Sequence, residues 1–499
     1  MLLGRTRRVH FVGIGGIGMS GIAELLANLG YAVSGSDARR SEITDRLEGL
    51  GVRLAIGHAV ENAGDAEVIV VSSAIGSENA EVVDARQRRV PVIPRAEMLA
   101  ELMRLKTGIA IAGSHGKTTT TSMIALVLER AGLDPTAVIG GKLSAFGSNA
   151  RLGLGEYMVA EADESDRSFL KLSPTIAVVT NIDCEHMDTY GSFDALVDAF
   201  AEFSGKVPFY GAVVACADDV SVFAMLRKTA RRTITYGFAD EANVRGLSPA
   251  GDGRSGRCGV QFEIRGVPNG AGTGAIELQV PGRHNLQNAL AAVAVGLELG
   301  VPFDRIRQAL AEFHGADRRY QVLGMAGGVT VVDDYGHHPT EVAAVLRAAR
   351  DGHPTRLVAV FQPHRYSRTR DLLEDFGPAL ALADVVVLTD IYAAGEAPIP
   401  GATLEHLASQ VRRDVRELHV APSLEDAIAC AAQLAQSGDL MVTLGAGSIG
   451  SAGARILDAI GSRSERAEAS EPRERSGDQG APASERVRGA GGRKSPRRS

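Results

Sequence analysis

The stretch TGIAIAGSHGKTTTTSMIALVLERAG (107–132) sets the architecture of the chain, because it reads as a buried strand, a glycine-bounded loop and a helix in direct succession. Its Gly-x-x-Gly-Lys-Thr loop is typical of phosphate binding, in which a lysine neutralises phosphate oxygens and a threonine hydroxyl reaches magnesium. The full consensus has a further glycine where this chain has Ile111, so the loop is a shortened version. We therefore predict an ATP site that includes Gly113, Ser114, His115, Gly116, Lys117, Thr118 and Thr119.

The sequence on both sides of this stretch also alternates between strand and helix patterns. Further strands are predicted at 9–15, 31–37, 67–73, 90–94, 157–163, 175–183, 212–219, 328–336, 356–363, 383–390 and 439–448. This alternation predicts an α/β protein with doubly wound parallel sheets. We expect a Rossmann-like N-terminal domain (1–104), a central P-loop-type ATPase domain (105–316), a Rossmann-like C-terminal domain (317–460) and a disordered, charged tail (461–499).

Composition narrows the class of protein. The 499 residues carry a net charge of -7, which argues against a nucleic-acid partner. The four cysteines show no C-x-x-C spacing, which fits a reducing cytoplasm. No uninterrupted apolar run approaches the length of a membrane span, so a cytoplasmic protein is expected. The oligomeric state is left open.

A second glycine-rich turn lies near the N-terminus, directly after the strand at 9–15. The sequence Gly13-Ile14-Gly15-Gly16-Ile17-Gly18 satisfies G-x-G-x-x-G, which lets a diphosphate approach the backbone at a helix N-terminus. Asp37 ends the next strand, where an acid commonly binds ribose hydroxyls. The motif alone does not separate NAD from other nucleotide diphosphates. The residues assigned to this site are Gly13, Gly15, Gly16, Gly18, Asp37 and Ser72.

Two acidic clusters follow strands of the central segment. They read Glu-Ala-Asp-Glu-Ser-Asp (161–166) and Asn-Ile-Asp-Cys-Glu-His-Met-Asp (181–188), and both lie at carboxyl ends of strands, where open α/β sheets bind ligands. Crowded carboxylates repel one another unless cations share the site, so magnesium accompanying ATP is the expected partner. The individual roles of Asp163, Glu164 and Asp166 are left open.

Two further motifs are rich in ring and guanidinium side chains. Asn285, at the start of a helix, is predicted either to contact adenine or to cap that helix. The strings DDYGHHPT (333–340) and QPHRYSRTR (362–370) follow two strands of the C-terminal segment. Their imidazoles and guanidiniums predict a surface that receives anions, since arginine matches carboxylate and phosphate oxygens bidentately.

Together these motifs closely resemble the Mur ligase family over residues 1–460. The resemblance rests on GIGGIGMSGIAELL, GSHGKTTTT, EADESD, TNIDCEHMDTY, GRHNLQNALAA, DDYGHHPTEV and FQPHRYSRTRDL, in that order. It implies an enzyme that uses ATP to join L-alanine to UDP-N-acetylmuramate in peptidoglycan precursor synthesis. The implied intermediate is an acyl phosphate.

The resemblance also implies roles for single residues. Lys117 and Thr118 match the contacts of the γ-phosphate and of a first magnesium ion, and Glu161 and His186 match ligands of a second. Asn285 matches an adenine contact. The residues implied to close over L-alanine and the muramoyl carboxylate are Tyr335, His337, Arg365 and Arg368; of these, His337, Arg365 and Arg368 are assigned with Lys117 to catalysis.

Three alternatives remain at this stage. A recycling ligase that attaches a whole tripeptide would share the architecture, although we expect it to differ in the first glycine turn and in the C-terminal strings. An NAD-dependent dehydrogenase would explain the turn at 13–18 but would leave the lysine loop and the acidic clusters without a role. An ATP-driven switch would use only the central domain.

Overall fold

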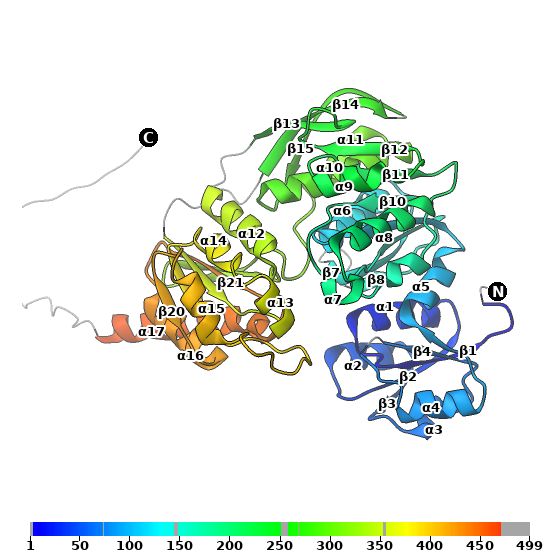
Figure 1. Ribbon diagram of the computed structural model, residues 1–499, viewed down its shortest axis with the longest axis horizontal. Helices are drawn as coiled ribbons and strands as arrows, with labels where there is room; N and C mark the ends of the chain where they lie inside the picture. Colours follow the sequence, from blue (N-terminus) through cyan, green and yellow to red (C-terminus); the bar gives the residue numbers. More distant parts are fainter. Residues whose placement is uncertain are drawn as a thin grey trace, which may run out of the picture.

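The computed structural model describes residues 3–72, 74–143, 148–250, 258–267, 269–352 and 356–470. Three α/β regions follow one another along the chain, and each is built on its own sheet (Figure 1). The predicted class, an α/β protein of three domains, is confirmed.

The N-terminal region is a five-stranded parallel sheet in the order β3-β2-β1-β4-β5. Because β1 lies at the centre, the strand order reverses there, which is the Rossmann-like arrangement. Its elements are β1 (Arg8–Val12), α1 (Ile17–Asn28), β2 (Ala32–Asp37), α2 (Glu42–Gly49), β3 (Arg53–Ile56), α3 (Val60–Ala63), β4 (Val68–Val71), α4 (Ala80–Gln87), β5 (Val92–Pro94) and α5 (Arg95–Met103).

The central region is a ten-stranded sheet in the order β15-β14-β13-β12-β11-β10-β6-β9-β7-β8. Strands β13 to β7 in this order are parallel, whereas β14 and β15 extend one edge through antiparallel pairing and β8 pairs antiparallel at the other. Helices α6 and α10 pack on each other over one face. The sequence analysis predicted β6, β9, β10 and β11 but missed the other parallel strands, the antiparallel extension and β8.

The central region contains the following strands and helices. They are β6 (Thr107–Ala112), α6 (Lys117–Arg130), β7 (Thr136–Leu143), β8 (Ser148–Arg151), β9 (Tyr157–Glu161), η1 (Ser168–Lys171), β10 (Ile176–Val179), α7 (Met187–Tyr190), α8 (Phe193–Gly205), β11 (Ala212–Cys216), α9 (Val220–Leu226), β12 (Thr233–Gly237), β13 (Val244–Ala250), β14 (Cys258–Val267), β15 (Gly270–Leu278), α10 (Arg283–Glu298) and α11 (Phe303–Ala311).

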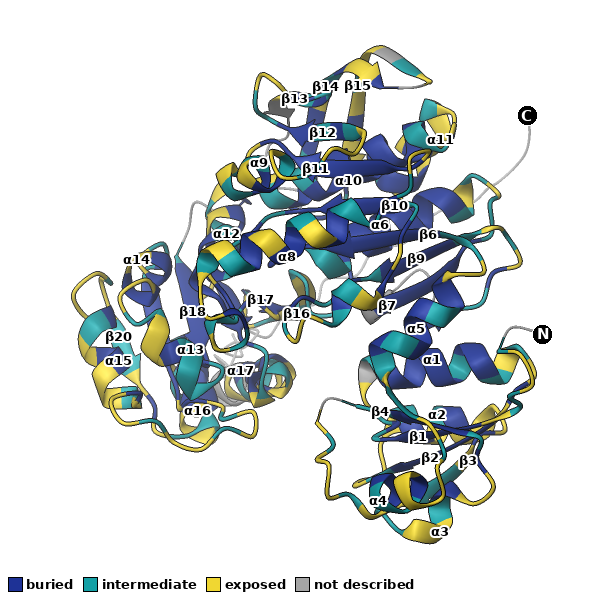
Figure 2. Cartoon of the chain, turned by 45° about the vertical axis from the view of Figure 1, so that its right-hand side comes forward, coloured by how far each residue is buried: buried dark blue, intermediate teal, exposed yellow. Residues whose placement is uncertain are grey.

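The C-terminal region is a six-stranded sheet in the order β16-β17-β21-β18-β19-β20, parallel except for β16. Apolar clusters fill both faces of this sheet, and its central strands are buried (Figure 2). Its elements are β16 (Gln321–Ala326), β17 (Val329–Asp334), α12 (Pro339–Gly352), β18 (Leu357–Phe361), α13 (Tyr366–Asp371), α14 (Phe376–Leu380), β19 (Val385–Leu388), α15 (Leu404–Val411), β20 (Leu418–Val420), α16 (Leu424–Leu434), β21 (Leu440–Leu444), η2 (Ser448–Ser451) and α17 (Ala452–Ser470).

The last helix differs from the expectation for the tail. Disorder was predicted from residue 461, yet α17 continues to Ser470. Arg463 explains part of this extension, because its guanidinium donates to the carbonyl oxygens of Ala432, Gln433 and Ala435 at the end of α16. Alanine, arginine and glutamate in this segment also favour helix. The rest of the predicted tail, 471–499, lies outside the described residues.

The N-terminal region packs on the central sheet through α1, which contacts β7 and β8, and through α5, which contacts η1. An ion pair of 3.3 Å between Arg95 and Asp163 joins the same two regions. Across the described residues, none of the helices is both long and apolar enough to span a bilayer.

Candidate active site

The lysine loop joins β6 to α6 at the centre of the largest sheet. A side chain at Gly113 would overlap the Thr180 hydroxyl, and the φ of +138° there disfavours any residue with a Cβ. The Lys117 ammonium donates to the carbonyl oxygens of Gly113 (2.6 Å) and Ser114 (3.3 Å). The loop therefore curls around its own lysine. The first residues of α6 line a cavity, which is where a helix N-terminus would favour an anion.

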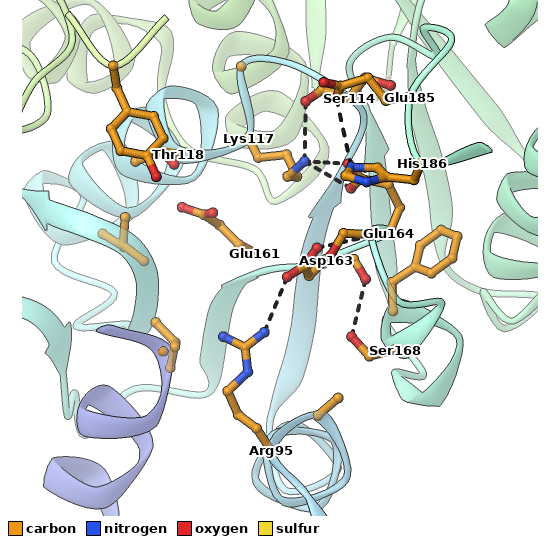
Figure 3. A pocket seen from close by; sticks show the side chains of 18 of the residues that line it. Arg95, Ser114, Lys117, Thr118, Glu161, Asp163, Glu164, Ser168, Glu185 and His186 are labelled. Atoms are coloured by element: carbon orange, nitrogen blue, oxygen red, sulfur yellow. Dashed lines mark hydrogen bonds and ion pairs between the residues drawn. The ribbon is translucent and has the colours of Figure 1, made fainter. Parts of the chain in front are cut away.

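Lys117 also forms an ion pair with Glu164, at 2.7 and 2.9 Å to the two carboxylate oxygens (Figure 3). Burial raises the pKa of Glu164 to about 7, although the Lys117 charge pulls it down. Burial opposes the charge of Lys117, but Glu164 and Asp163 outweigh it and raise the pKa of this lysine. Lys117 is therefore a fixed positive charge at neutral pH.

Three potential metal ligands lie beside this pair. Atoms of Glu164, Glu185 and His186 come within 4.8 Å of one another, and Glu161 lies in the same cavity (Figure 3). Burial lowers the pKa of His186, which leaves its imidazole neutral and able to donate a lone pair. Carboxylate oxygens with one imidazole suit a hard or borderline divalent cation, so the donor set fits magnesium. The sequence singled out His186 but neither Glu164 nor Glu185 as ligands.

All three regions line one cavity of about 390 Å³. The N-terminal region contributes Gly18 and Arg95, and the central region contributes the lysine loop and the acidic cluster. The C-terminal lining residues are Arg319, Tyr335, His337, Glu341, His364, Arg365 and Arg368. We call this space the reaction cavity. It brings together every residue that the sequence assigned to catalysis.

A second cavity, of about 560 Å³, lies between the central and C-terminal regions. His284 and Asn285 line it, and Gly116, Arg319 and Glu341 line both cavities. Asn285 donates to the carbonyl oxygen of Pro281 at 2.7 Å. The two cavities therefore meet at the lysine loop.

The positive charge of the C-terminal wall of the reaction cavity comes from its arginines. Burial lowers the pKa of His337 to about 4 and that of His364 to about 3, and burial also lowers the pKa of His338. The sequence analysis counted these imidazoles among the groups that attract anions. Because these partly buried rings are neutral at pH 7, the anion-attracting charge comes from Arg319, Arg365 and Arg368.

Direct contacts tie the C-terminal region to the lysine loop and the acidic cluster. The Arg368 guanidinium lies 3.3 Å from Glu185, and the Thr340 hydroxyl donates to Asp183 at 2.7 Å. His115 lies between Asp183 (2.9 Å) and Glu341 (3.5 Å). Burial would lower the pKa of His115, but hydrogen bonds to both carboxylates outweigh it and raise that pKa to about 10.

The N-terminal glycine turn is held by its own region. Asp37 accepts a hydrogen bond of 2.8 Å from the Gly15 amide, and a side chain at Gly13 would press on Ser72 at 3.3 Å. Of the residues predicted to bind the UDP-sugar, only Gly18 also lines the reaction cavity. A side chain at Gly18 would collide with the Arg95 guanidinium, so this glycine lets Arg95 reach the cavity.

Sequence reasoning missed several charged residues of the site. Arg95 opens α5, Arg319 lies in the Asp-Arg-Arg-Tyr string that precedes β16, and Glu341 follows DDYGHHPT by one residue. Glu341 lies within the quoted motif DDYGHHPTEV but was given no role, whereas Arg95 and Arg319 belong to no recognisable local motif. The paired arginines at 318–319 could have indicated an anion-binding site. That Arg319 lines both cavities, however, depends on the tertiary fold.

Comparison with known families covers most of the chain. Three family models match in succession: "Mur ligase family, catalytic domain" at residues 8–107, "Mur ligase middle domain" at 111–296 and "Mur ligase, glutamate ligase domain" at 318–447.

Individual relatives agree with this match. A UDP-N-acetylmuramate–L-alanine ligase from Anaeromyxobacter dehalogenans is 54% identical, over 91% of this chain and 98% of its own. The solved structure of a UDP-N-acetylmuramate–alanine ligase from Thermotoga maritima superposes with a TM-score of 0.75 at 29% identity, covering 93% of this chain and all of that one. A murein peptide ligase from Psychrobacter arcticus shares the fold at 24% identity, with a TM-score of 0.68 and coverage of 91% and 98%.

Proposed function

The chain belongs to the Mur ligase family, and from this we propose that it is an ATP-dependent enzyme that joins L-alanine to the carboxylate of UDP-N-acetylmuramate. The observation that carries the proposal is the reaction cavity, where Lys117, the acidic cluster and the arginines of the C-terminal region meet. The product carries the first amino acid of the peptidoglycan stem.

ATP is proposed to span the two cavities. Its adenine would lie in the larger one beside His284 and Asn285, and its phosphates would follow the loop formed by Gly113, Ser114, His115, Gly116, Lys117, Thr118 and Thr119. Burial lowers the pKa of His284 to about 4, so this ring would be neutral against a base. The γ-phosphate would enter the reaction cavity at Lys117, because the cavities join there.

The chemistry follows from the poor reactivity of a carboxylate. One muramoyl carboxylate oxygen attacks the γ-phosphorus of ATP, so that an acyl phosphate forms and ADP leaves. The amine of L-alanine, after releasing a proton to solvent, then attacks the acyl carbon. A second proton leaves the nitrogen as phosphate departs with the former carboxylate oxygen. Lys117, Arg365 and Arg368 are placed to stabilise the negative charge that develops in both steps.

Neutral His337 also lines this cavity and is assigned to orient L-alanine together with Tyr335. A neutral imidazole can accept a hydrogen bond from the amine without repelling its positive charge. The C-terminal region would thereby bind the phosphate and carboxylate groups through its arginines and the amine of L-alanine through a ring nitrogen of His337.

We propose Thr118, Glu161 and His186 as magnesium ligands and add Glu164 and Glu185, because these two carboxylates lie with His186 in one cluster. When bound, magnesium would neutralise phosphate oxygens and align the γ-phosphate. The ion pair between Lys117 and Glu164 would loosen as phosphate oxygens take over the lysine.

Each domain then has one task. We propose that residues 1–104 bind the UDP-sugar through Gly13, Gly15, Gly16, Gly18, Asp37 and Ser72, that 105–316 bind ATP, and that 317–460 bind L-alanine. The four cysteines are all unpaired, which supports a reducing cytoplasm as the place of the reaction.

The test offers the purified chain ATP, UDP-N-acetylmuramate and either L-alanine or the stem tripeptide, with phosphate release and product mass as readouts. We expect phosphate release only with UDP-N-acetylmuramate present, and a product heavier by one alanine residue. Turnover of the tripeptide in preference to L-alanine would establish the recycling ligase instead. Reduction of NAD without phosphate release would establish a dehydrogenase.

A further inference from the structure

A second loop of the C-terminal region lies behind the loop that carries Arg365 and Arg368. It follows β19 and contains Tyr392 and Glu396, neither of which lines the reaction cavity. The rings of Tyr392 and His364 are stacked, with centroids 5.6 Å apart and planes 12° apart. The two loops are therefore in direct contact at the rim of the reaction cavity.

The backbone of the arginine loop needs this support. Arg365 has a φ of +71°, a conformation that residues with a Cβ keep only when their surroundings enforce it. Its amide donates to the carbonyl oxygen of Tyr392 at 2.8 Å, and the Tyr392 amide donates to that of Pro363 at 2.9 Å. The Tyr392 segment thus fixes the backbone on both sides of His364.

Glu396 completes the support with its side chain. Its carboxylate accepts hydrogen bonds from the Ser367 amide (3.0 Å) and hydroxyl (2.6 Å), and it lies 3.9 Å from the Arg365 guanidinium. Arg365, the N-cap residue of α13, makes no capping hydrogen bond with its side chain, so Glu396 supplies the missing acceptor from another loop. Burial opposes its charge, but the hydrogen bonds from Ser367 lower the pKa of Glu396.

We propose that Glu396 is a positioning residue that holds the Arg365 guanidinium in the orientation needed for L-alanine and the acyl phosphate. Glu396 lies outside the lining of the reaction cavity and would act through its hydrogen bonds with Ser367 and its attraction to the Arg365 guanidinium, without touching substrate. This inference rests on the proposed function, because Arg365 is assigned there to the reaction cavity.

The experiment compares Glu396→Ala, Glu396→Gln, Arg365→Ala and the double variant Glu396→Ala/Arg365→Ala in the phosphate-release assay. Glu396→Ala is expected to lower kcat/KM for L-alanine by about 10- to 100-fold, because small displacements of a positioned group cost that much. KM for ATP should stay near the wild-type value, since neither residue lines the adenine cavity. Glu396→Gln keeps an acceptor for Ser367 and should recover part of the loss.

The double variant tests the route of action. If Glu396 acts through Arg365, adding Glu396→Ala to Arg365→Ala should cost little more than Arg365→Ala alone. Glu425→Ala is the matched control, because Glu425 pairs with Arg455 on the same domain and lines neither cavity. This control should leave kcat/KM for L-alanine within about twofold of wild type.

Three results would overturn the inference. Glu396→Ala could match wild type in kcat/KM for L-alanine, its effect could be fully additive with Arg365→Ala, or it could raise KM for ATP and L-alanine equally. In each case an active wild-type chain leaves the proposed function standing. A wild-type chain that releases no phosphate with L-alanine would overturn both.

Discussion

Lys117 is the residue on which the proposed chemistry depends most. Replacing it with alanine is expected to lower kcat by about 10²- to 10³-fold, as the loss of one group that stabilises transition-state charge does in other enzymes. Phosphate release at saturating substrates measures the effect. Near-normal turnover of Lys117→Ala would refute the assignment.

That variant also leaves the buried Glu164 without its partner, so stability must be followed separately. The double variant Lys117→Ala/Glu164→Gln also removes the unpartnered carboxyl and should melt closer to wild type while remaining inactive. Lys171→Ala is the control for loss of an exposed lysine, because Lys171 pairs with Glu97 at the surface and should keep full activity.

A second prediction at the residue scale concerns Glu81, which is fully buried in the N-terminal region. Burial would raise its pKa, but hydrogen bonds from His10, Ser36 and Asn62 outweigh burial and lower the pKa to about 2. The gap from the ordinary value of 4.5 corresponds to about 3 kcal/mol of stability. Because the folded-state pKa is the lower one, this stability is complete above pH 4.5 and is lost as the pH falls toward 2.

Urea unfolding of wild type and Glu81→Gln at several pH values checks this expectation. The variant should be less stable at pH 7, and the difference should shrink as the pH falls below 4.5. Glu61→Gln, on the neighbouring α3, is the control and should show no such convergence. A difference between Glu81→Gln and wild type that is constant from pH 7 to pH 3 would contradict the network as described.

Single residues also mark the limit of sequence reasoning. The lysine loop could be predicted because its spacing is local and its chemistry is constrained. Arg95 and Arg319 could not, because each enters the site from an element with no motif of its own. The sequence also does not show how far the histidines in DDYGHHPT and QPHRYSRTR are buried, and burial lowers the pKa of His337 and of His364.

At the scale of elements, most strands of the parallel sheets were predictable because buried strands are continuous apolar runs between glycine turns. The parallel strands β3, β7, β12 and β20 were not predicted. Nor were β13 to β15, whose sequence, rich in glycine and polar residues, lacks such runs. The start of the disordered tail was predicted at residue 461, too early, because the composition of the following residues is that of a disordered segment.

Helix α17 gives a prediction at this scale. Truncation after Gly461 removes Arg463 and its three bonds to carbonyl oxygens near the end of α16, at a cost of about 1–2 kcal/mol. We expect a lower melting temperature for that truncation and for Arg463→Ala, but unchanged values after truncation at Ser470. All three proteins should retain kcat. Equal melting temperatures for the two truncations would show that the extension does not stabilise the fold.

At the scale of the whole molecule, the reaction cavity exists only while all three domains are together. Polar contacts join the C-terminal region to the central region, among them Arg368 with Glu185 and Thr340 with Asp183. Polar interfaces of this kind are typical of domains that move relative to one another. Closure would assemble the site and exclude water, which limits wasteful hydrolysis of ATP.

Small-angle scattering tests this closure. The radius of gyration should fall when a non-hydrolysable ATP analogue and UDP-N-acetylmuramate are added together. Thr340→Val, which loses the hydrogen bond to Asp183, should weaken the response. Identical scattering with and without ligands would count against closure.

The central claim is that ATP activates the muramoyl carboxylate as an acyl phosphate before L-alanine attacks. The most direct measurement uses UDP-N-acetylmuramate labelled with ¹⁸O in its carboxylate, followed by mass analysis of the inorganic phosphate released. We predict that one labelled oxygen passes from each carboxylate to phosphate, and that the label appears there only when L-alanine is present to complete the reaction. Unlabelled phosphate from a reaction that forms the alanyl product would contradict the claim.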